Sequence, residues 1–140
     1  MFSERTSLTT TLEQPPLAFI APKTLQGVRV FIAEDEPMLV WALEEVLSDL
    51  GCKVVGTVGR VTDALEFVGQ NTFDIAILDG ALEDGPIDQV VTQLALRGTP
   101  FVIASGLSNA GMQERFGHVT TVQKPYKDSD LQTALLAALG

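Results

Sequence analysis

Five side chains suited to phosphate and metal chemistry lie at the ends of apolar segments in this sequence. Glu34 and Asp35 follow one segment, Asp79 and Ser105 end two others, and Lys124 follows the last. Crowded carboxylates repel one another, and such hard oxygen ligands suit Mg²⁺, which often shares a phosphoryl oxygen. A carboxylate beside Mg²⁺ and a lysine is a suitable nucleophile toward phosphorus. The residue types indicate phosphoryl transfer to Asp79, with Lys124 neutralising charge and Ser105 donating a hydrogen bond.

Five predicted strands are the elements that would bring these residues together. Short apolar runs rich in β-branched residues predict them at 28–33, 53–58, 73–78, 100–104 and 119–122. Amphipathic helices alternate with these runs, and this order indicates a parallel sheet covered on both faces. Right-handed crossovers then favour a doubly wound α/β sandwich, which binds ligands beyond the carboxyl ends of its strands.

The helices are predicted from apolar residues at helical spacing and from signals at their ends. Pro37 suits the first position of the first helix, and Gly51 ends that helix. Pro86 is predicted to open the third helix, and Asp128 to cap the last one. The segment 108–117 is polar and is predicted to form at best a short helix.

Composition excludes several classes of protein. The 140 residues include nine Lys plus Arg and eighteen Asp plus Glu, a formal charge of −9, which argues against nucleic acid and anionic membranes as partners. A hydrophobic content of 46% allows one domain with a sizeable core. No apolar run approaches the roughly 20 residues of a membrane span, and no signal peptide is expected. The single cysteine, Cys52, indicates a reducing, cytoplasmic location.

Residues 1–26 differ in composition from the rest and are expected to form a flexible or docking N-terminal arm. Ser and Thr are common there, and three prolines follow them. The apolar run 17–21 would be the part that docks, although a disordered leader is the simpler interpretation. Residues 27–140 are expected to form the folded domain.

From about Val28 to Leu139, roughly four fifths of the chain, the sequence resembles the receiver domain of two-component response regulators. Each matching motif is weak alone, but four of them occur in order, each at a predicted strand end. They are Glu34-Asp35, Leu78-Asp79, Ser105 and Lys124-Pro125. We therefore expect a five-stranded parallel sheet in the flavodoxin-like order 2-1-3-4-5, with helices on both faces.

The resemblance also implies a function. Asp79 would accept a phosphoryl group from a histidine kinase or a histidine phosphotransfer protein, in a Mg²⁺-dependent manner. Asp35 would bind Mg²⁺ directly and Glu34 mostly through water, and the backbone carbonyl of Ala81 would complete the site with Asp79. We expect a signalling module that acts on an unidentified protein target and assists only its own phosphorylation and dephosphorylation. No DNA-binding effector domain is expected, and self-association into a homodimer is left open.

The sequence departs from the family pattern at several places. Where the family often has an aromatic residue, three positions before the lysine, this chain has Thr121. The signal would then leave by another route, and we expect the backbone after Ser105 to move. The loop 80–86 carries two extra acids, Glu83 and Asp84, where a Met-Pro pair is common. These traits are similar to those of single-domain or atypical receivers.

Two alternative functions are weighed against this one. A degenerate receiver would bind partners without phosphorylation; Thr121 argues weakly for it, and the intact Asp35, Asp79 and Lys124 argue against it. A small phosphatase of the haloacid dehalogenase type would also use an aspartyl nucleophile. That family needs a second Asp two residues later, where Ala81 stands.

Three residues outside the motifs have their own interpretations. Trp41 is predicted to point away from the core face of the first helix. It is either a half-buried ring covered by the N-terminal arm or a docking residue for the histidine-bearing partner. His118 is expected in a surface loop, and Cys52 is expected to be a half-buried thiol.

Overall fold

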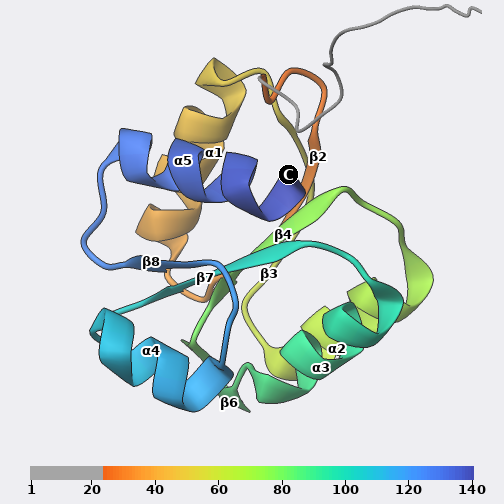
Figure 1. The fold of residues 1–140 in the computed structure, drawn as a ribbon. Helices are drawn as coiled ribbons and strands as arrows, with labels where there is room; N and C mark the ends of the chain where they lie inside the picture. The colour runs from red at the N-terminus through yellow and green to blue at the C-terminus, as the bar shows by residue number, and fades with distance from the viewer. Residues whose placement is uncertain (1–23) are drawn as a thin grey trace, which may run out of the picture.

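The strands form where the sequence has short apolar runs, because strands of a covered parallel sheet are buried on both faces. The computed structural model describes residues 24–140. Its helices and strands, most of them labelled in Figure 1, alternate along most of the chain. They are β2 (Arg29–Ala33), α1 (Pro37–Asp49), β3 (Lys53–Val58), α2 (Val61–Gln70), β4 (Ile75–Asp79), β5 (Ala81–Leu82), β6 (Gly85–Pro86), α3 (Asp88–Arg97), β7 (Phe101–Ser105), α4 (Asn109–Phe116), β8 (Thr121–Gln123) and α5 (Asp128–Leu139).

The main sheet has five parallel strands in the order β3-β2-β4-β7-β8. Counted along the chain, these strands lie in the order 2-1-3-4-5, which confirms the predicted doubly wound α/β fold. Helices α1 and α5 cover one face of the sheet, and α2, α3 and α4 lie on the other (Figure 1). Because the strands run the same way, their carboxyl ends meet at one edge, where the residues after β2, β4 and β7 come together.

Two apolar cores fill the space between the sheet and its helices. The core under α1 and α5 takes its helical contribution from leucines and one alanine that are almost fully buried. These are Leu43, Leu47, Leu131, Ala134 and Leu135. The core under α2 and α3 combines the other face of β2 and β4 with apolar residues from both helices.

Three phenylalanine rings pack together at the second core, two of them buried and one, Phe67, partly buried. The rings of Phe31 and Phe67 stack with centroids 4.4 Å apart, and Phe73 lies 5.3 Å from Phe31. Gly56 of β3 pairs with Phe31 just after a register shift between the two strands. A Cβ atom at Gly56 would overlap the Phe67 ring. The absent side chain therefore lets α2 pack closely on the sheet.

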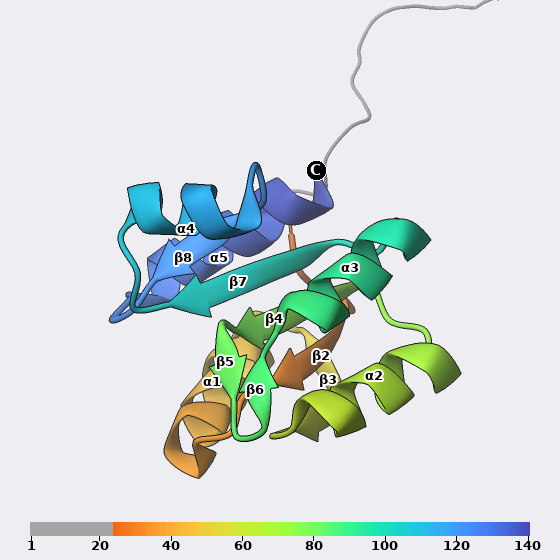
Figure 2. The same cartoon turned by 90° about the horizontal axis from the view of Figure 1, so that it is seen from below.

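A small antiparallel hairpin of β5 and β6 was not predicted. It follows β4 directly, and Figure 2 shows it beyond the carboxyl end of that strand. Pro86 lies in β6, so the prediction that Pro86 opens the third helix is wrong; α3 begins at Asp88, after an N-cap at Ile87. Two-residue strands carry no readable periodicity, and proline also suits an edge strand.

The ends of the last two helices were predicted with different success. The prediction that Asp128 caps α5 is wrong, because the N-cap is Lys127, whose amide donates to the Asp130 carboxylate at 3.0 Å. The weak segment before β8 does form a short helix, α4. The Ser108 hydroxyl caps it by accepting a hydrogen bond from the Gly111 amide at 3.1 Å.

Most of the expected N-terminal arm, residues 1–23, lies outside the described residues. Leu25 is only 3% exposed and packs in the core under α1 and α5. Its carbonyl accepts a hydrogen bond from the Cys52 thiol at 3.5 Å, and the Gly27 amide donates to the Gly51 carbonyl at 2.8 Å. Leu25 is thus part of the folded domain.

Single-residue expectations agree with the structure where it describes them. Trp41 is 61% exposed on α1, His118 is exposed in the loop before β8, and Cys52 is partly buried. Within residues 24–140, no helix combines the length and the apolar character needed to cross a membrane.

Candidate functional site

Two neighbouring strands, β2 and β4, place the acidic residues of the site. Glu34 and Asp35 follow β2 directly, and Asp79 is the last residue of β4. The two strands pair with Ala33 beside Leu78, so the residues that follow emerge side by side. One carboxylate oxygen from each of Glu34, Asp35 and Asp79 lies within 4.8 Å of the other two. The structure therefore brings together the three acids that the sequence placed at strand ends.

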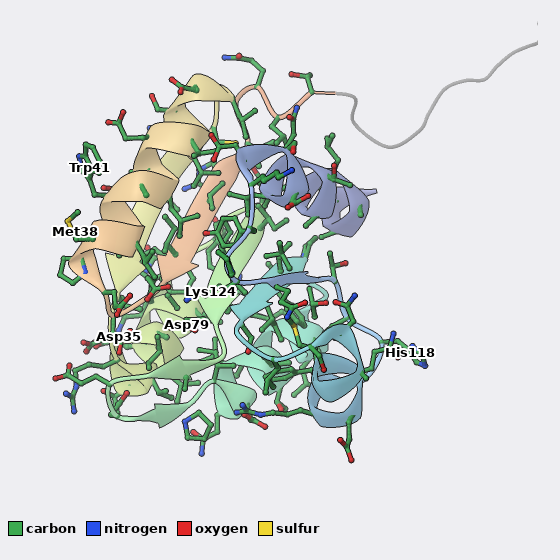
Figure 3. The ribbon with its side chains drawn as sticks, turned by 90° about the vertical axis from the view of Figure 1, so that its left-hand side faces the viewer. Asp35, Met38, Trp41, Asp79, His118 and Lys124 are labelled. Atoms are coloured by element: carbon green, nitrogen blue, oxygen red, sulfur yellow. The ribbon has the colours of Figure 1, made fainter. Side chains whose placement is uncertain are left out.

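Lys124 brings a positive charge into this acidic cluster from just after β8. Its Nζ atom lies 3.1 Å from Oε1 of Glu34 and 3.4 Å from Oδ1 of Asp79. Figure 3 shows Asp35, Asp79 and Lys124 at the same edge of the sheet, although they come from three different strand ends. The Lys124 amide donates to the carbonyl of Ser105 at 2.7 Å, which fixes the backbone that carries the ammonium group.

Burial, neighbouring charges and hydrogen bonds all shift the pKa values of these side chains. Glu34 is 5% exposed, and burial raises the pKa of its carboxyl above the ordinary value. The charge of Asp79 raises the Glu34 pKa further, whereas hydrogen bonds from the Glu36 amide and the Lys124 ammonium lower it. Burial lowers the pKa of Lys124, but the hydrogen bond and charge of Glu34, with the charge of Asp79, raise it by more. Lys124 therefore remains protonated near neutral pH.

The donor set fits a divalent cation of the Mg²⁺ type. Three carboxyl groups face one ammonium group, so acidic groups outnumber the cation. Carboxylate oxygens are hard ligands of the kind that Mg²⁺ takes, usually one or two together with several waters. Both oxygens of Glu34 already accept hydrogen bonds, from Lys124 and from the Glu36 amide at 3.2 Å. The water-mediated role of Glu34 and the direct roles of Asp35 and Asp79 stay predictions.

Ser105 lies at the end of β7 and is 8% exposed. Its hydroxyl oxygen accepts a hydrogen bond from the Leu107 amide at 3.1 Å. A Cβ atom at Gly80 would lie 3.4 Å from this oxygen, so the hydroxyl faces the backbone that follows Asp79. The hydrogen bonds found in residues 24–140 do not join the Ser105 hydroxyl to Asp79 or Lys124. The structure places this hydroxyl beside the cluster rather than within it.

Ala81 and Thr121 border the site without joining the cluster of charged groups. Ala81 is the exposed first residue of β5, two residues after Asp79, and the role of its carbonyl stays a prediction. Thr121 begins β8 beside Ile103 and is half-buried. It lines a hollow of about 660 Å³ that also reaches Lys124. Because threonine is small, open space remains at this position, where a larger aromatic side chain would otherwise stand.

Sequence reasoning missed two tertiary contacts near the site. Asp84, at the tip of the hairpin, accepts hydrogen bonds from the first two amides of α2, which are 23 and 22 residues away in the chain. Arg115 of α4 donates to Asp88 at 2.8 Å and to the carbonyl of Gly80 at 3.4 Å. Helix caps are usually predicted from the residue just before the helix, and Asp84 lies far from α2 in the sequence. The Arg115 contacts also join residues 27 and 35 positions apart, so neither set of contacts has a local signal.

A model of a known protein family matches most of this sequence. The response regulator receiver domain matches residues 30–136, which include all four strand-end motifs. This chain belongs to that family. The receiver is thus a signal-transduction module of two-component systems, as the resemblance in the sequence indicated.

Relatives of this receiver agree in fold and in sequence. The transcriptional regulatory protein PdtaR of Mycobacterium tuberculosis is 32% identical over 116 residues, covering 79% of this chain and 56% of PdtaR. The chain therefore spans about half the length of this curated relative. The solution structure of SdrG from Sphingomonas melonis Fr1 is 37% identical, with a TM-score of 0.71, covering 81% of this chain and 98% of SdrG.

A third similarity concerns the fold. The receiver domain of the sensor histidine kinase PA1611 from Pseudomonas aeruginosa PAO1 has a TM-score of 0.72 at 21% identity, covering 81% of this chain and 98% of that domain. A magnesium ion is coordinated in the active-site cleft of that domain. The acidic cluster at the strand ends of this receiver is compatible with the same ion.

Proposed function

We propose that this receiver is a phosphoacceptor of a two-component system or phosphorelay, phosphorylated on Asp79 with the help of Mg²⁺ and acting through contacts with partner proteins. The convergence of Asp79 with two further acids and with Lys124, whose Nζ lies 3.4 Å from Asp79 Oδ1, is the observation that carries this proposal. Such a cluster offers a nucleophile, a metal-binding set and a fixed cation at one point, which phosphoryl transfer requires.

The transfer uses Asp79 as the nucleophile. A carboxylate oxygen of Asp79 forms a bond to phosphorus, and the phosphorus–nitrogen bond of a phosphohistidine breaks, its electron pair returning to the imidazole nitrogen. Lys124 stays protonated and neutralises charge that gathers on the phosphoryl oxygens. A bound Mg²⁺ would supply the remaining positive charge, held by Asp35 and Asp79 with the carbonyl of Ala81. Ser105 would donate its hydroxyl proton to a phosphoryl oxygen while its oxygen still accepts from Leu107.

Labelling with acetyl phosphate tests this function directly. The wild-type chain with Mg²⁺ should gain a single phosphoryl group by intact mass, and the gain should disappear with excess chelator. Asp79→Asn keeps the shape, removes the nucleophile and should abolish labelling. Asp63→Asn, which changes an exposed acid on α2, is the matched control and should label like the wild type.

The same assay separates the other functions. Labelling of Asp79→Asn at the wild-type rate would exclude Asp79 as the acceptor. No adduct on the wild type would favour a degenerate receiver that binds its partners without phosphorylation. Repeated turnover of phosphoesters would favour the phosphatase instead.

The donor would dock on the outer face of α1. Met38 and Trp41 are 75% and 61% exposed there, one turn of the helix apart (Figure 3). Trp41 also borders a shallow hollow of about 310 Å³ that is lined by Glu34 and Asp35. An exposed tryptophan beside the acceptor site suits a protein interface, where this residue type carries much of the binding energy.

Trp41→Ala should therefore slow transfer from the cognate kinase or phosphotransfer protein about ten-fold, the size of a typical interface contact. Labelling by acetyl phosphate, which needs no docking, should stay near the wild-type rate. Leu96→Ala is the matched control, because Leu96 is 84% exposed on α3. Equal loss of both reactions in Trp41→Ala would show that Trp41 supports the fold instead.

A further inference from the structure

The hairpin β5–β6 connects the phosphoacceptor strand β4 to α3. Its base is closed by a hydrogen bond of 3.2 Å from the Ile87 amide to the Gly80 carbonyl, directly after Asp79. Leu82 is 6% exposed and packs in the core under α2 and α3, which anchors one strand of the hairpin. The position of Ala81, between these two fixed points, is therefore set by the way the hairpin is held.

The tip of the hairpin is fastened to the start of α2 by one carboxylate. Oδ1 of Asp84 accepts a hydrogen bond from the Val61 amide at 2.5 Å, and Oδ2 accepts one from the Thr62 amide at 3.2 Å. The residue before the helix, Arg60, makes no side-chain cap. Asp84 thus satisfies two helix-end amides that a local cap residue would ordinarily serve.

The neighbouring residue fastens the tip to the loop between β3 and α2. The Glu83 amide donates to the carbonyl of Gly59 at 3.3 Å, and its carboxylate lies 3.4 Å from Arg60. Gly59 in turn lies against the backbone of Asp35, since a Cβ atom at Gly59 would come within 3.3 Å of the Asp35 Cα. The hairpin tip is thereby linked, through this loop, to the backbone of the proposed metal ligand Asp35.

We infer that Asp84 is a positioning residue for the metal and phosphoryl site, holding the hairpin so that the Ala81 carbonyl and the Asp35 loop keep a fixed spacing around Asp79. This inference rests on the proposed function. The same two hydrogen bonds cap α2 and hold the hairpin, because the capping carboxylate belongs to the hairpin itself. A cap at Arg60 would stabilise α2 equally but would not join the hairpin to this helix.

Asp84→Ala should weaken Mg²⁺ binding to the full chain about ten-fold, the lower end of what the loss of a partner outside the metal ligands costs. Titration calorimetry with Mg²⁺ alone measures the dissociation constant, and amide exchange without metal reports on residues 34–36, 59 and 80–85. Asp84→Asn keeps one acceptor oxygen and should bind Mg²⁺ with intermediate affinity. Glu83→Ala is the matched control, since it removes one charge from the same tip but only an exposed ion pair, and should change the affinity less than two-fold.

Each outcome decides the inference. A Tm loss in Asp84→Ala with an unchanged Mg²⁺ dissociation constant and unchanged exchange at 80–85 would overturn it, because Asp84 would then be only a helix cap. An equal affinity loss in Glu83→Ala would overturn it as well, since charge alone would explain the effect. If the wild type bound no Mg²⁺, the proposed function would fail, and the role of Asp84 toward the metal would be rejected with it. Faster exchange at 59 and 80–85 in Asp84→Ala would then still show that the loops are held together.

Discussion

The two sides of the site edge are built differently. On the side of the hairpin, α3 and its N-cap contribute Ile87, Val90 and Leu94, all fully buried, and Asp84 ties the hairpin to α2. On the other side, α4 buries only Met112 among its eight residues, and β8 has three residues that pair with β7 alone. Segments with little buried surface open at low free energy, and moving elements are drawn from them. We expect the hairpin side to hold the backbone around Asp79 in place, and α4 on the other side to be the element that responds to the acceptor.

Helix α4 is attached to the site edge by a weak contact. Arg115 joins α4 to Asp88 and to the Gly80 carbonyl, but its side chain is 34% exposed and that of Asp88 is 54% exposed. Exposed ion pairs of this kind contribute little to stability. The hollow at Thr121 leaves further room beside α4 and α5. Movement of α4 would therefore break few contacts.

The largest expected effect compares two fully buried side chains, one from each side. Ile87→Ala should lower the free energy of unfolding by about 2–5 kcal/mol, as is usual for such a truncation in a packed core. Met112→Ala should cost less than half as much, because α4 is able to open without unfolding the sheet. Urea unfolding of both variants measures the difference. Equal losses would mean that α4 is as firmly packed as α3, and the contrast between the two sides would be wrong.

A second test asks whether the looser side responds to the acceptor. Beryllofluoride bound at Asp79 would give the Ser105 hydroxyl a charged acceptor, drawing in the backbone that already donates from Leu107. Amide exchange in Leu107–Gly117 should slow markedly with beryllofluoride and Mg²⁺, while exchange in α2 stays the same. Slowing confined to the neighbours of Asp79 would show that the signal leaves by a different route.

The smallest effect concerns acid stability of the firmer side. The hydrogen bond from the Val61 amide holds the pKa of the Asp84 carboxyl below its ordinary value. A depressed folded-state pKa stabilises the protein above the unfolded pKa of about 3.9, and this stabilisation is lost as the pH falls through the folded value. The stability difference between wild type and Asp84→Ala should be constant at neutral pH and shrink below about pH 4. A difference that persists unchanged in acid would show that the Asp84 charge is not what fastens the hairpin.

Much of the fold and of the site edge was predictable because the relevant signals are local. Apolar runs mark the strands, and in a parallel sheet the strand ends must meet, so Asp79 and Lys124 could be placed together without a structure. The hairpin contacts could not, because the Asp84 cap joins residues 23 positions apart and leaves α2 without a local cap signal. Pro86 and Asp128 were misassigned for a related reason: each residue type suits more than one position, and tertiary contacts choose between them.

Gly56 controls how closely α2 packs on the sheet because it has no side chain. Asp84 caps the N-terminal end of α2. Near the other end of this helix, the Phe67 ring occupies the space where a side chain at position 56 would lie. A larger residue at position 56 would therefore require the Phe67 ring to move or a smaller residue at position 67. The distance of α2 from the sheet is thus set at this end by one glycine and one ring, without any hydrogen bond or charge.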